Sequence, residues 1–389
     1  MKVVVPAEHH QGERRVALVP EAVVKLIKLG LEVAIQDGAG LTANQDNNAY
    51  LAAGATIVST SDISKALSSA DVVASVRPLD PDVGKTLKSG AVTLSFLSPT
   101  NNPDEIKALS AAGVTALSFD LVPRISRAQS MDALSSQALC AGYRTALIAA
   151  ERSTKFFPML MTAAGTVQPA KVLVLGAGVA GLQAMATARR LGAVVSAYDV
   201  RASSADEVKS MGATFINLNL ETLEGAGGYA REMGEDRAKA QQDALKPFIS
   251  ESDVVITTAA IPGRKAPLLV TASMVENMKP GSVIVDLAAE SGGNVEGSIA
   301  GQDVLLPTAG GDVTVIGFKD LASQLSVHSS KLYAQNVVSL LTLITTEGEV
   351  NADPSDEVVA GSAVVFAGDV RDAMARETLG LQPLAKDGE

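Results

Sequence analysis

Short runs of consecutive apolar residues alternate along this chain with segments whose apolar residues recur every three or four positions. Runs of the first kind are typical of strands buried on both faces of a parallel sheet. Segments of the second kind are typical of amphipathic helices that cover such a sheet. In the first third of the chain this pattern predicts strands at 2–6, 31–35, 71–76, 91–96 and 114–117, and helices at 20–29 and 104–112.

A second and more regular series begins after Pro169. It predicts strands at 171–175, 194–198, 214–216, 253–257, 282–286 and 304–306, with long helical segments at 134–155 and 319–341 on either side. Residues 358–365 are expected to form a strand or a hairpin edge.

Strands joined by helices form right-handed parallel crossovers. We therefore expect an α/β fold with two Rossmann-like, doubly wound parallel-sheet domains, separated by a cleft and joined by the two long helices. The first domain is expected to contain residues 1–135 and 318–389, and the second residues 136–317.

The composition agrees with buried parallel sheets. Apolar residues make up 47% of the 389 residues and Trp is absent, so the packing rests on Val, Leu, Ile and Ala. This length is too great for one ordinary core, which supports two domains. A formal charge of −11 argues against nucleic acid as a partner, because phosphate contacts need a basic face.

Cysteine usage and the apolar runs bear on the location of the chain. Cys140 is the only cysteine and cannot form an internal disulfide, which fits a reducing compartment. The N-terminal residues run directly into an expected strand, without the apolar region of a signal peptide. The longest apolar stretch near the C-terminus, 337–344, is shorter than the roughly 20 residues that a spanning helix needs. We expect a cytoplasmic chain that crosses no membrane by itself.

The most informative motif is Gly176-Ala-Gly178-Val-Ala-Gly181, which follows an expected strand and opens an expected helix. In a dinucleotide-binding unit the first glycine permits a tight turn, the second lets the pyrophosphate approach, and the third lets the helix pack on the strand. The helix N-terminus then faces the phosphates. This context predicts a bound dinucleotide, and a Rossmann-like domain without a nucleotide is the alternative.

Asp199 ends the next expected strand, where an acidic side chain accepts a hydrogen bond from the ribose 2′-hydroxyl. A carboxylate there repels the 2′-phosphate of NADP, so NAD(H) is the expected cofactor. Arg201 has two interpretations: an exposed arginine that covers the adenine, or a contact to a 2′-phosphate. The residues expected to bind the cofactor are Gly176, Gly178, Val179, Ala180, Gly181, Asp199, Val200, Arg201, Gly228, Tyr229, Thr258 and Ala259.

Several segments together resemble a known family. Gly12-Glu-Arg-Arg-Val-Ala-Leu-Val-Pro20 is similar to the opening shared by alanine dehydrogenase and the proton-translocating nicotinamide nucleotide transhydrogenase. The segment 123–137, Pro-Arg-Ile-Ser-Arg-Ala-Gln-Ser-Met-Asp-Ala-Leu-Ser-Ser-Gln, resembles a loop of the NAD(H)-binding component of the transhydrogenase. The glycine-rich stretch 225–233 and the tail 356–365 also resemble that component, and the resemblance extends over essentially the whole chain.

The resemblance implies a function and a set of site residues. Such a component passes hydride between NADH and NADP(H) bound on a partner component, coupled to proton movement through a membrane-embedded component. Arg124, Gln129, Asp132 and Ser135 would place the nicotinamide ring, and Tyr229 would close over the nucleotide. The resemblance also implies the separate alpha subunit of a multi-subunit form, held peripherally at the inner membrane by its partners. The long helices and the apolar tail lead us to expect a homodimer.

Residue chemistry agrees with these roles but leaves an alternative open. Gln129 and Ser135 offer the donors and acceptors that a carboxamide needs, and Arg124 and Asp132 are able to form an ion pair that fixes the loop. The alternative is that Gln129, Asp132 and Ser135 only cap the helix expected to begin near Met131, since Asp and Ser favour helix starts.

Two other functions remain open at this stage. An amino-acid dehydrogenase similar to alanine dehydrogenase would use Arg15 for a substrate carboxylate, but it also needs an acid/base group and a cation in its cleft. The stretches that hold its histidine and lysine read Leu-Ser-Phe-Leu-Ser-Pro at 94–99 and Ala-Ser-Val-Arg-Pro at 74–78 here. A catalytically silent NAD sensor would share the glycine pattern.

No sequence pattern predicts a metal site, because neither HExxH nor CxxC occurs. The acidic pair Asp286 and Glu290 follows a late strand and is expected to fix a loop, with a cofactor contact as the minority interpretation.

Overall fold

A computed structural model describes residues 1–220, 234–260 and 264–384, and these form two compact units. The first unit contains residues 1–137 and 323–389, and the second contains residues 138–322. The predicted Gly228 and Tyr229 lie outside the described residues. Within those ranges, no helix is both long and apolar enough to cross a membrane.

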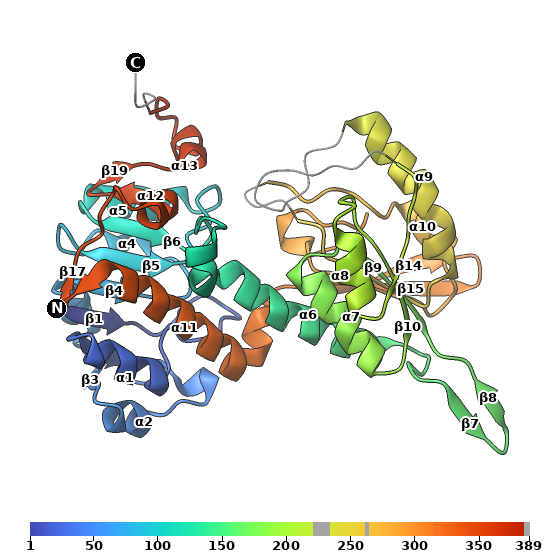
Figure 1. The fold of residues 1–389 in the computed structure, drawn as a ribbon, viewed down its shortest axis with the longest axis horizontal. Helices are drawn as coiled ribbons and strands as arrows, with labels where there is room; N and C mark the ends of the chain where they lie inside the picture. Colours follow the sequence, from blue (N-terminus) through green and yellow to red (C-terminus); the bar gives the residue numbers. More distant parts are fainter. Residues whose placement is uncertain (221–233, 261–263, 385–389) are drawn as a thin grey trace. The chain divides into compact units, whose positions relative to one another are not determined.

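The first unit is built on an eight-stranded sheet in the order β19-β18-β6-β5-β4-β1-β2-β3 (Figure 1). The six strands β1 to β6 are all parallel, whereas β18 runs antiparallel to β6 and β19 runs antiparallel to β18. The strands are β1 (Lys2–Val5), β2 (Glu32–Gln36), β3 (Thr56–Val58), β4 (Val72–Ala74), β5 (Val92–Ser95), β6 (Thr115–Ser118), β18 (Ala363–Phe366) and β19 (Asp369–Val370).

Alternate residues of a strand point to opposite faces of the sheet. Both faces of this sheet carry apolar residues and are therefore covered by helices. In β4, Val72 and Ala74 belong to one buried cluster and Val73 to another. The helical elements of this unit are α1 (Pro20–Lys28), η1 (Leu41–Ala43), α2 (Asn47–Ala52), α3 (Ile63–Ser68), α4 (Pro81–Gly84), α5 (Pro103–Ala111), η2 (Ser126–Met131), η5 (Leu321–Leu325, which starts in the second unit), α11 (Ser326–Ile344), α12 (Glu357–Ser362) and α13 (Ala373–Thr378), with a small ribbon of β16 (Thr345–Thr346) and β17 (Glu349–Val350).

The second unit has a seven-stranded sheet in the order β11-β10-β9-β12-β13-β15-β14. Its first six strands follow the 3-2-1-4-5-6 order of a dinucleotide-binding sheet, and β14 is added antiparallel to β15. The strands are β9 (Lys171–Leu175), β10 (Val194–Tyr198), β11 (Thr214–Phe215), β12 (Val254–Thr257), β13 (Val283–Asp286), β14 (Gln302–Thr308) and β15 (Gly311–Gly317).

The helical elements of the second unit are α6 (Ala133–Arg152, which begins in the first unit), α7 (Val179–Arg190), α8 (Ser204–Ser210), α9 (Glu235–Glu251), α10 (Ala272–Val275) and η4 (Ala289–Ser291). A two-stranded hairpin of β7 (Leu160–Thr162) and β8 (Gly165–Val167) extends away from the sheet (Figure 1).

The pattern of apolar runs therefore predicted the fold class correctly, with the bounds of β9 and β10 as expected. The expectation of a strand over 358–365 was wrong for its first half, where α12 forms instead. Asp356 causes the difference, because its carboxylate accepts hydrogen bonds from the backbone N–H groups of Val358 and Val359 and so caps a helix. The strand expected at 304–306 is the centre of the longer β14.

Candidate functional site

The turn after β9 has the geometry that the glycine pattern predicts. Gly176 has a φ of 109°, and a Cβ there would lie 2.5 Å from the Thr258 hydroxyl oxygen. A Cβ at Gly181 would lie 2.0 Å from the carbonyl oxygen of Gly176. The turn requires the first glycine, and the close contact between helix and strand requires the third.

The middle glycine has a different environment, because a Cβ at Gly178 would meet no atom of the described residues within 4 Å. Gly178 is the N-cap of α7, and no side chain of the described residues caps that end. The N–H groups of the first turn, at Val179 and Ala180, thus lack a side-chain acceptor among these residues at the positive end of the helix dipole. Open space beside such a helix end fits a pyrophosphate.

Residues that follow three neighbouring strands meet at the same edge of the sheet. Leu175 is in register with Tyr198 of β10 and with Thr257 of β12. Asp199 and Thr258 therefore lie on either side of the glycine turn. Since the strand order reverses at β9, this edge is the topological switch point at which ligands bind in open α/β sheets.

Asp199 is bound within the protein on both of its carboxylate oxygens. Oδ2 accepts from the backbone N–H of Ala177 at 2.7 Å and from Arg201 Nη2 at 3.0 Å. Oδ1 accepts from the backbone N–H and from Nε of Arg201, both at 2.9 Å. Arg201 is thus not the exposed arginine of the first interpretation, because its side chain is only 18% exposed and is paired with Asp199. Val200 packs against the core beside them.

The other side of the glycine turn is formed by Thr258 and Ala259, and it is held by Asn294, a residue that the sequence patterns did not single out. Thr258 donates from its hydroxyl to the carbonyl oxygen of Gly176 at 3.2 Å. The Asn294 amide accepts from the N–H of Ala259 at 3.1 Å and donates to the carbonyl of Ala259 at 2.8 Å, as a neighbouring strand would. The only sequence signal for this role is the Gly-Gly-Asn stretch, in which Gly292 and Gly293 have positive φ.

Asp286 fixes the loop that carries Asn294. Its carboxylate is fully buried and accepts hydrogen bonds from the Thr257 hydroxyl and from the N–H groups of Ala288, Asn294 and Val295. Glu290 accepts at 3.3 Å from the N–H of Asp320. Both contacts agree with the loop-fixing interpretation of this acidic pair.

The loop with the four expected ring-placing residues lies in the first unit, at η2 and the start of α6. Arg124 and Gln129 are exposed. Asp132 accepts from the N–H of Ser135 at 2.8 Å and from its hydroxyl at 2.6 Å. These two residues therefore do cap α6, which is the structural interpretation left open by the sequence. A contact between these four residues and a nicotinamide ring stays a prediction.

The switch point of the first sheet, between β1 and β4, is filled by the protein itself. Glu8 accepts from the N–H groups of Val76 and Arg77 at 2.6 and 3.1 Å. Burial raises the pKa of Glu8 to about 7, although these two hydrogen bonds oppose the rise. A ligand at this edge would have to displace Glu8.

Arg15 is engaged beside this edge. Its Nε and Nη2 donate to the two oxygens of Glu13 at 2.7 and 2.6 Å, and Nη1 donates to Gln137 at 2.9 Å. Burial works to raise the pKa of Glu13, but the hydrogen bonds and charge of Arg15, with the charge of Arg77, outweigh it and lower this pKa to about 2. Glu13 is thus a permanent counter-ion that occupies the guanidinium.

Comparison with known proteins places this geometry in a family. Residues 4–141 match the family described as "Alanine dehydrogenase/PNT, N-terminal domain", and residues 145–373 match "Alanine dehydrogenase/PNT, C-terminal domain". The first part of the NAD(P) transhydrogenase alpha subunit from Rhodospirillum rubrum is 46% identical over 383 residues, which cover 95% of this chain and 97% of the relative. The chain belongs to the NAD(P) transhydrogenase alpha-subunit family.

A solved structure supports the assignment to the transhydrogenases, and a more distant relative is an alanine dehydrogenase, as the shared family description indicates. The crystal structure of transhydrogenase from Sinorhizobium meliloti has a TM-score of 0.84 and 42% identity, covering 95% of this chain and 100% of that one. Alanine dehydrogenase from Mycolicibacterium smegmatis is 32% identical over 77% of this chain and 75% of its own length.

Aromatic packing and a tyrosine hydrogen bond occupy the stretches 94–99 and 74–78, where an amino-acid dehydrogenase was expected to carry its histidine and lysine. Phe96 follows β5 and lies 5.4 Å, between ring centroids, from the buried Tyr333. The Tyr333 hydroxyl donates to the carbonyl oxygen of Ser75, after β4, at 2.7 Å, and burial raises the pKa of Tyr333 well above its usual value. Neither Phe96 nor Ser75 carries a group that exchanges a proton near neutral pH.

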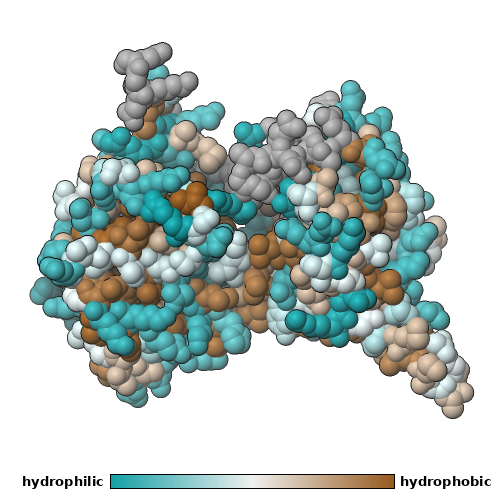
Figure 2. All heavy atoms as spheres, in the orientation of Figure 1, coloured by the Kyte–Doolittle hydropathy of each residue, from teal (hydrophilic) through white to brown (hydrophobic). Residues whose placement is uncertain are grey.

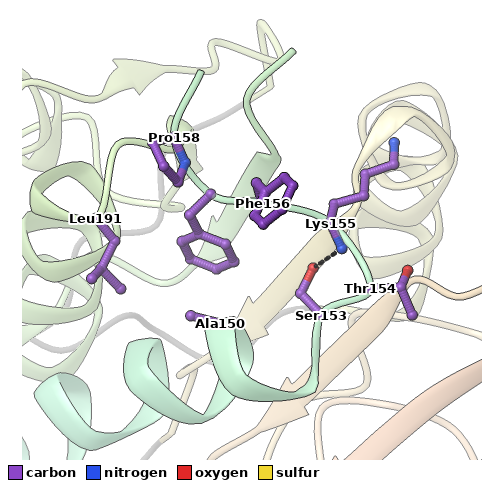
Figure 3. Close-up of a pocket in the computed structure, with 8 residues that line it drawn as sticks. Ala150, Ser153, Thr154, Lys155, Phe156, Pro158 and Leu191 are labelled. Carbon is purple, nitrogen blue, oxygen red and sulfur yellow. Dashed lines mark hydrogen bonds between the residues drawn. The ribbon is translucent and has the colours of Figure 1, made fainter. Parts of the chain in front are cut away.

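A pocket of about 430 Å³ lies at the other end of α7 (Figure 3). It is lined by residues at the end of α6, by the segment that follows, and by Leu191: Ala150, Ser153, Thr154, Lys155, Phe156, Phe157, Pro158 and Leu191. Leu191 is the C-cap of α7, whereas Gly178 is its N-cap. A helix of this length separates the two ends by roughly 18 Å, so this pocket is distinct from the glycine turn.

Proposed function

We propose that the chain is the NAD(H)-binding subunit of a proton-translocating NAD(P) transhydrogenase, which passes hydride between NADH bound here and NADP⁺ bound on a partner component. The observation that carries the proposal is the combination of an open Gly178 at an uncapped helix end with a close-packed Gly176 and Gly181 among the described residues. A group that needs backbone N–H donors at close range explains a glycine with free space around it.

The residues around the turn define what each part of the nucleotide would contact. The first turn of α7, through Val179 and Ala180, holds the pyrophosphate. Asp199 accepts from the adenosine ribose, and its negative charge disfavours a 2′-phosphate, so NAD(H) binds here rather than NADP(H). Thr258 and Ala259 line the opposite side of the turn. Tyr229 and Gly228 belong to the segment proposed to close over the nucleotide.

The bound nicotinamide supplies or accepts the hydride. The task of the chain is then alignment and exclusion of water, with no protein acid or base. Gln129 and Ser135 orient the carboxamide, while Asp132 holds Ser135 at the start of α6. Arg124, exposed beside η2, is proposed to contact the cofactor or its loop through its charge.

The remaining components of the proposed complex lie outside this chain. An NADP(H)-binding component receives the hydride and a membrane-embedded component moves the proton. The chain is proposed to stay in the cytoplasm, attached peripherally to the inner membrane by these partners. Relatives named alpha subunits of NAD(P) transhydrogenase support such an assembly.

The alternative of an amino-acid dehydrogenase is disfavoured by two contacts. Arg15, which would bind the substrate carboxylate, is only 5% exposed and is held by Glu13 and Gln137. Phe96 and Tyr333 pack together at the end of β5 and offer no acid/base group there. Glu8, whose pKa is about 7, is held by the N–H groups of Val76 and Arg77.

A homodimer is proposed from the apolar surface of the second unit. The hairpin of β7 and β8 and the segment before it expose Met161 (78%), Phe156 (59%) and Met159 (54%), and Figure 2 shows apolar side chains along this hairpin. Such a patch is unfavourable in water, and a second copy of the chain would cover it. Sedimentation of the wild type and of Met161→Glu tests this point: dissociation of the variant supports the dimer, and a monomeric wild type contradicts it.

The function is tested by reconstitution. Membranes stripped of this subunit are assayed for hydride transfer from NADPH to an NAD⁺ analogue, with increasing amounts of the purified chain. Restoration that saturates with added chain is expected. In parallel, the chain alone is incubated with NADH, pyruvate and ammonium. Turnover there without restoration of transfer would make it an amino-acid dehydrogenase, and NADH binding with neither activity would make it a sensor.

A further inference from the structure

The exposed Gln129 lies on a short 3₁₀ turn, η2, whose other side is buried. Ala128 and Met131 of this turn belong to the core of the first unit. In a 3₁₀ helix residues three apart share a face, so these two side chains anchor the turn while Gln129 points away from the core. The apolar contact sets the depth of the turn, whereas directional polar contacts are needed to set its orientation.

A bidentate ion pair fixes the turn on one side. Arg127 donates from Nη1 and Nη2 to the two oxygens of Asp356, both at 2.9 Å. This fork geometry defines orientation as well as distance, unlike a contact from a lysine. The hydrogen bond from Arg127 is the main cause that lowers the pKa of Asp356, so the pair stays charged at neutral pH.

Asp356 is itself held in place by the helix that it caps. Its Oδ1 accepts from the N–H groups of Val358 and Val359 at 2.8 and 3.4 Å, and both valines are buried in the core. The ion pair therefore connects η2 to a rigid helix start rather than to a freely rotating surface side chain.

A second contact fixes the turn on its other side. Asn336, on α11 and 6% exposed, donates from Nδ2 to the carbonyl oxygen of Ser130 at 2.9 Å. Its Oδ1 accepts from the Ser136 hydroxyl at 2.7 Å, which connects the same amide to the first turn of α6. Gln129 thus lies between two tethered residues, Arg127 and Ser130, and both tethers come from the C-terminal segment of the first unit.

We propose that Arg127, Asp356 and Asn336 are positioning residues for hydride transfer, which hold η2 so that Gln129 presents its amide to the nicotinamide in one orientation. This inference rests on the proposed function. None of the three touches the nucleotide in this proposal. They act by restricting the loop, because a small displacement of an aligning group is enough to slow a reaction that depends on near-attack geometry.

The variants are Asp356→Asn and Arg127→Gln, singly and together. Asparagine is as good an N-cap as aspartate, so Asp356→Asn keeps α12 while it removes the charged fork. Arg371→Gln is the matched control, since it removes an exposed arginine that pairs with Asp369 in the same C-terminal segment, away from η2. Arg127→Lys tests rescue, because it keeps the charge and loses the bidentate geometry.

We measure hydride transfer in the reconstituted complex, NADH dissociation constants of the purified chain, and amide hydrogen exchange of residues 124–132. Each single variant is expected to slow transfer by about ten-fold with less than about two-fold change in NADH affinity. The double variant is expected to be no slower than either single one, because both remove the same contact. Arg127→Lys should recover only part of the rate, and exchange in 124–132 should rise in all but the Arg371→Gln control.

The outcomes separate this inference from the proposed function. If the wild type restores transfer and Asp356→Asn is as fast, the positioning role is wrong and the proposed function stands. If the wild type restores no transfer, the proposed function fails. The exchange measurement still tests whether the Arg127–Asp356 ion pair restricts η2, and unchanged hydrogen exchange in Asp356→Asn would show that it does not. A loss of NADH affinity equal to the loss in rate also overturns the alignment role.

Discussion

Asp199 holds the guanidinium of Arg201 through two hydrogen bonds of 2.9 and 3.0 Å, at the strand end where a ribose is expected. With the backbone donors of Ala177 and Arg201, all four acceptor positions of the carboxylate are in use. A ribose hydroxyl that binds Asp199 must therefore replace one of these donors. Replacing the Arg201 side chain leaves the turn unchanged, since the other two donors are backbone N–H groups of the turn.

Asp199→Ala is expected to weaken NADH binding by about ten-fold or more, because it removes a charged acceptor. It should also reduce the preference for NADH over NADPH, because the repulsion of a 2′-phosphate disappears. Equilibrium titration with both nucleotides measures the two effects. Arg201→Gln is the comparison variant, which leaves the carboxylate uncompensated and should increase the preference for NADH. An unchanged preference in Asp199→Ala would refute the role of Asp199.

Two of the three glycines of the turn, Gly178 and Gly181, are expected to respond differently to the same substitution. Gly178→Ala should lower NADH affinity and leave thermal stability unchanged, since its Cβ meets no described protein atom but occupies the approach of the pyrophosphate. Gly181→Ala should destabilise the second unit, since its Cβ would lie 2.0 Å from a carbonyl oxygen. Thermal unfolding and NADH titration of both variants check this. Equal NADH affinity in Gly178→Ala and wild type would contradict a pyrophosphate at this glycine.

Gln129→Asn is expected to slow hydride transfer far more than it weakens NADH binding. The shorter side chain keeps the same amide but moves it by about one carbon–carbon bond, which misplaces the ring and leaves the pyrophosphate site intact. Transfer rates in the reconstituted complex are compared with dissociation constants of the purified chain. Equal losses in both quantities would argue against alignment.

The raised pKa of Glu8 leads us to expect that the stability of the first unit changes with pH. Its pKa in the folded state, about 7, is above the ordinary value of 4.5. The folded state therefore binds this proton more tightly, and the resulting stability is present below pH 4.5 and is lost as the pH rises through 7. A shift of this size corresponds to about 3 kcal/mol.

Urea unfolding of the wild type and of Glu8→Gln at pH 5, 6, 7 and 8 tests this expectation. The difference in unfolding free energy between the two proteins should change by a few kcal/mol across this range, with the wild type losing relative stability as the pH rises. Glu13 does not interfere, because its pKa of about 2 keeps it ionised throughout. A constant difference would show that Glu8 does not titrate in this window.

The sequence predicted the bounds of those elements that end at a residue next to them in the chain. The bounds of β9 and β10 follow from apolar runs that end at Gly176 and Asp199. Capping is also local, but the sequence pattern at 358–365 favoured a strand because Val is the commonest residue there. One aspartate, Asp356, outweighed that propensity over a single turn.

The site was predictable where backbone chemistry alone decides the residue, as at Gly176, Gly178 and Gly181. Its supporting contacts were not, because they depend on which elements the fold brings together. Asn294 braces Ala259 from a different loop, and Asp356 reaches Arg127 from 229 positions away in sequence. Even for Arg201, two residues after the predicted Asp199, the sequence did not predict the ion pair with that aspartate, because the direction of a long side chain is not fixed by its neighbours in sequence.

The first sheet is completed by β18, which pairs with β6 although some 240 residues separate the two strands in sequence. During translation, all of residues 138–322 are therefore synthesised before β18, the strand that pairs with the edge of β6. During that interval the nucleotide-binding unit has every residue it needs to fold, whereas the N-terminal unit presents an open strand edge that is able to pair with other chains. Synthesis of this protein thus has a vulnerable period that ends only when β18 has been made.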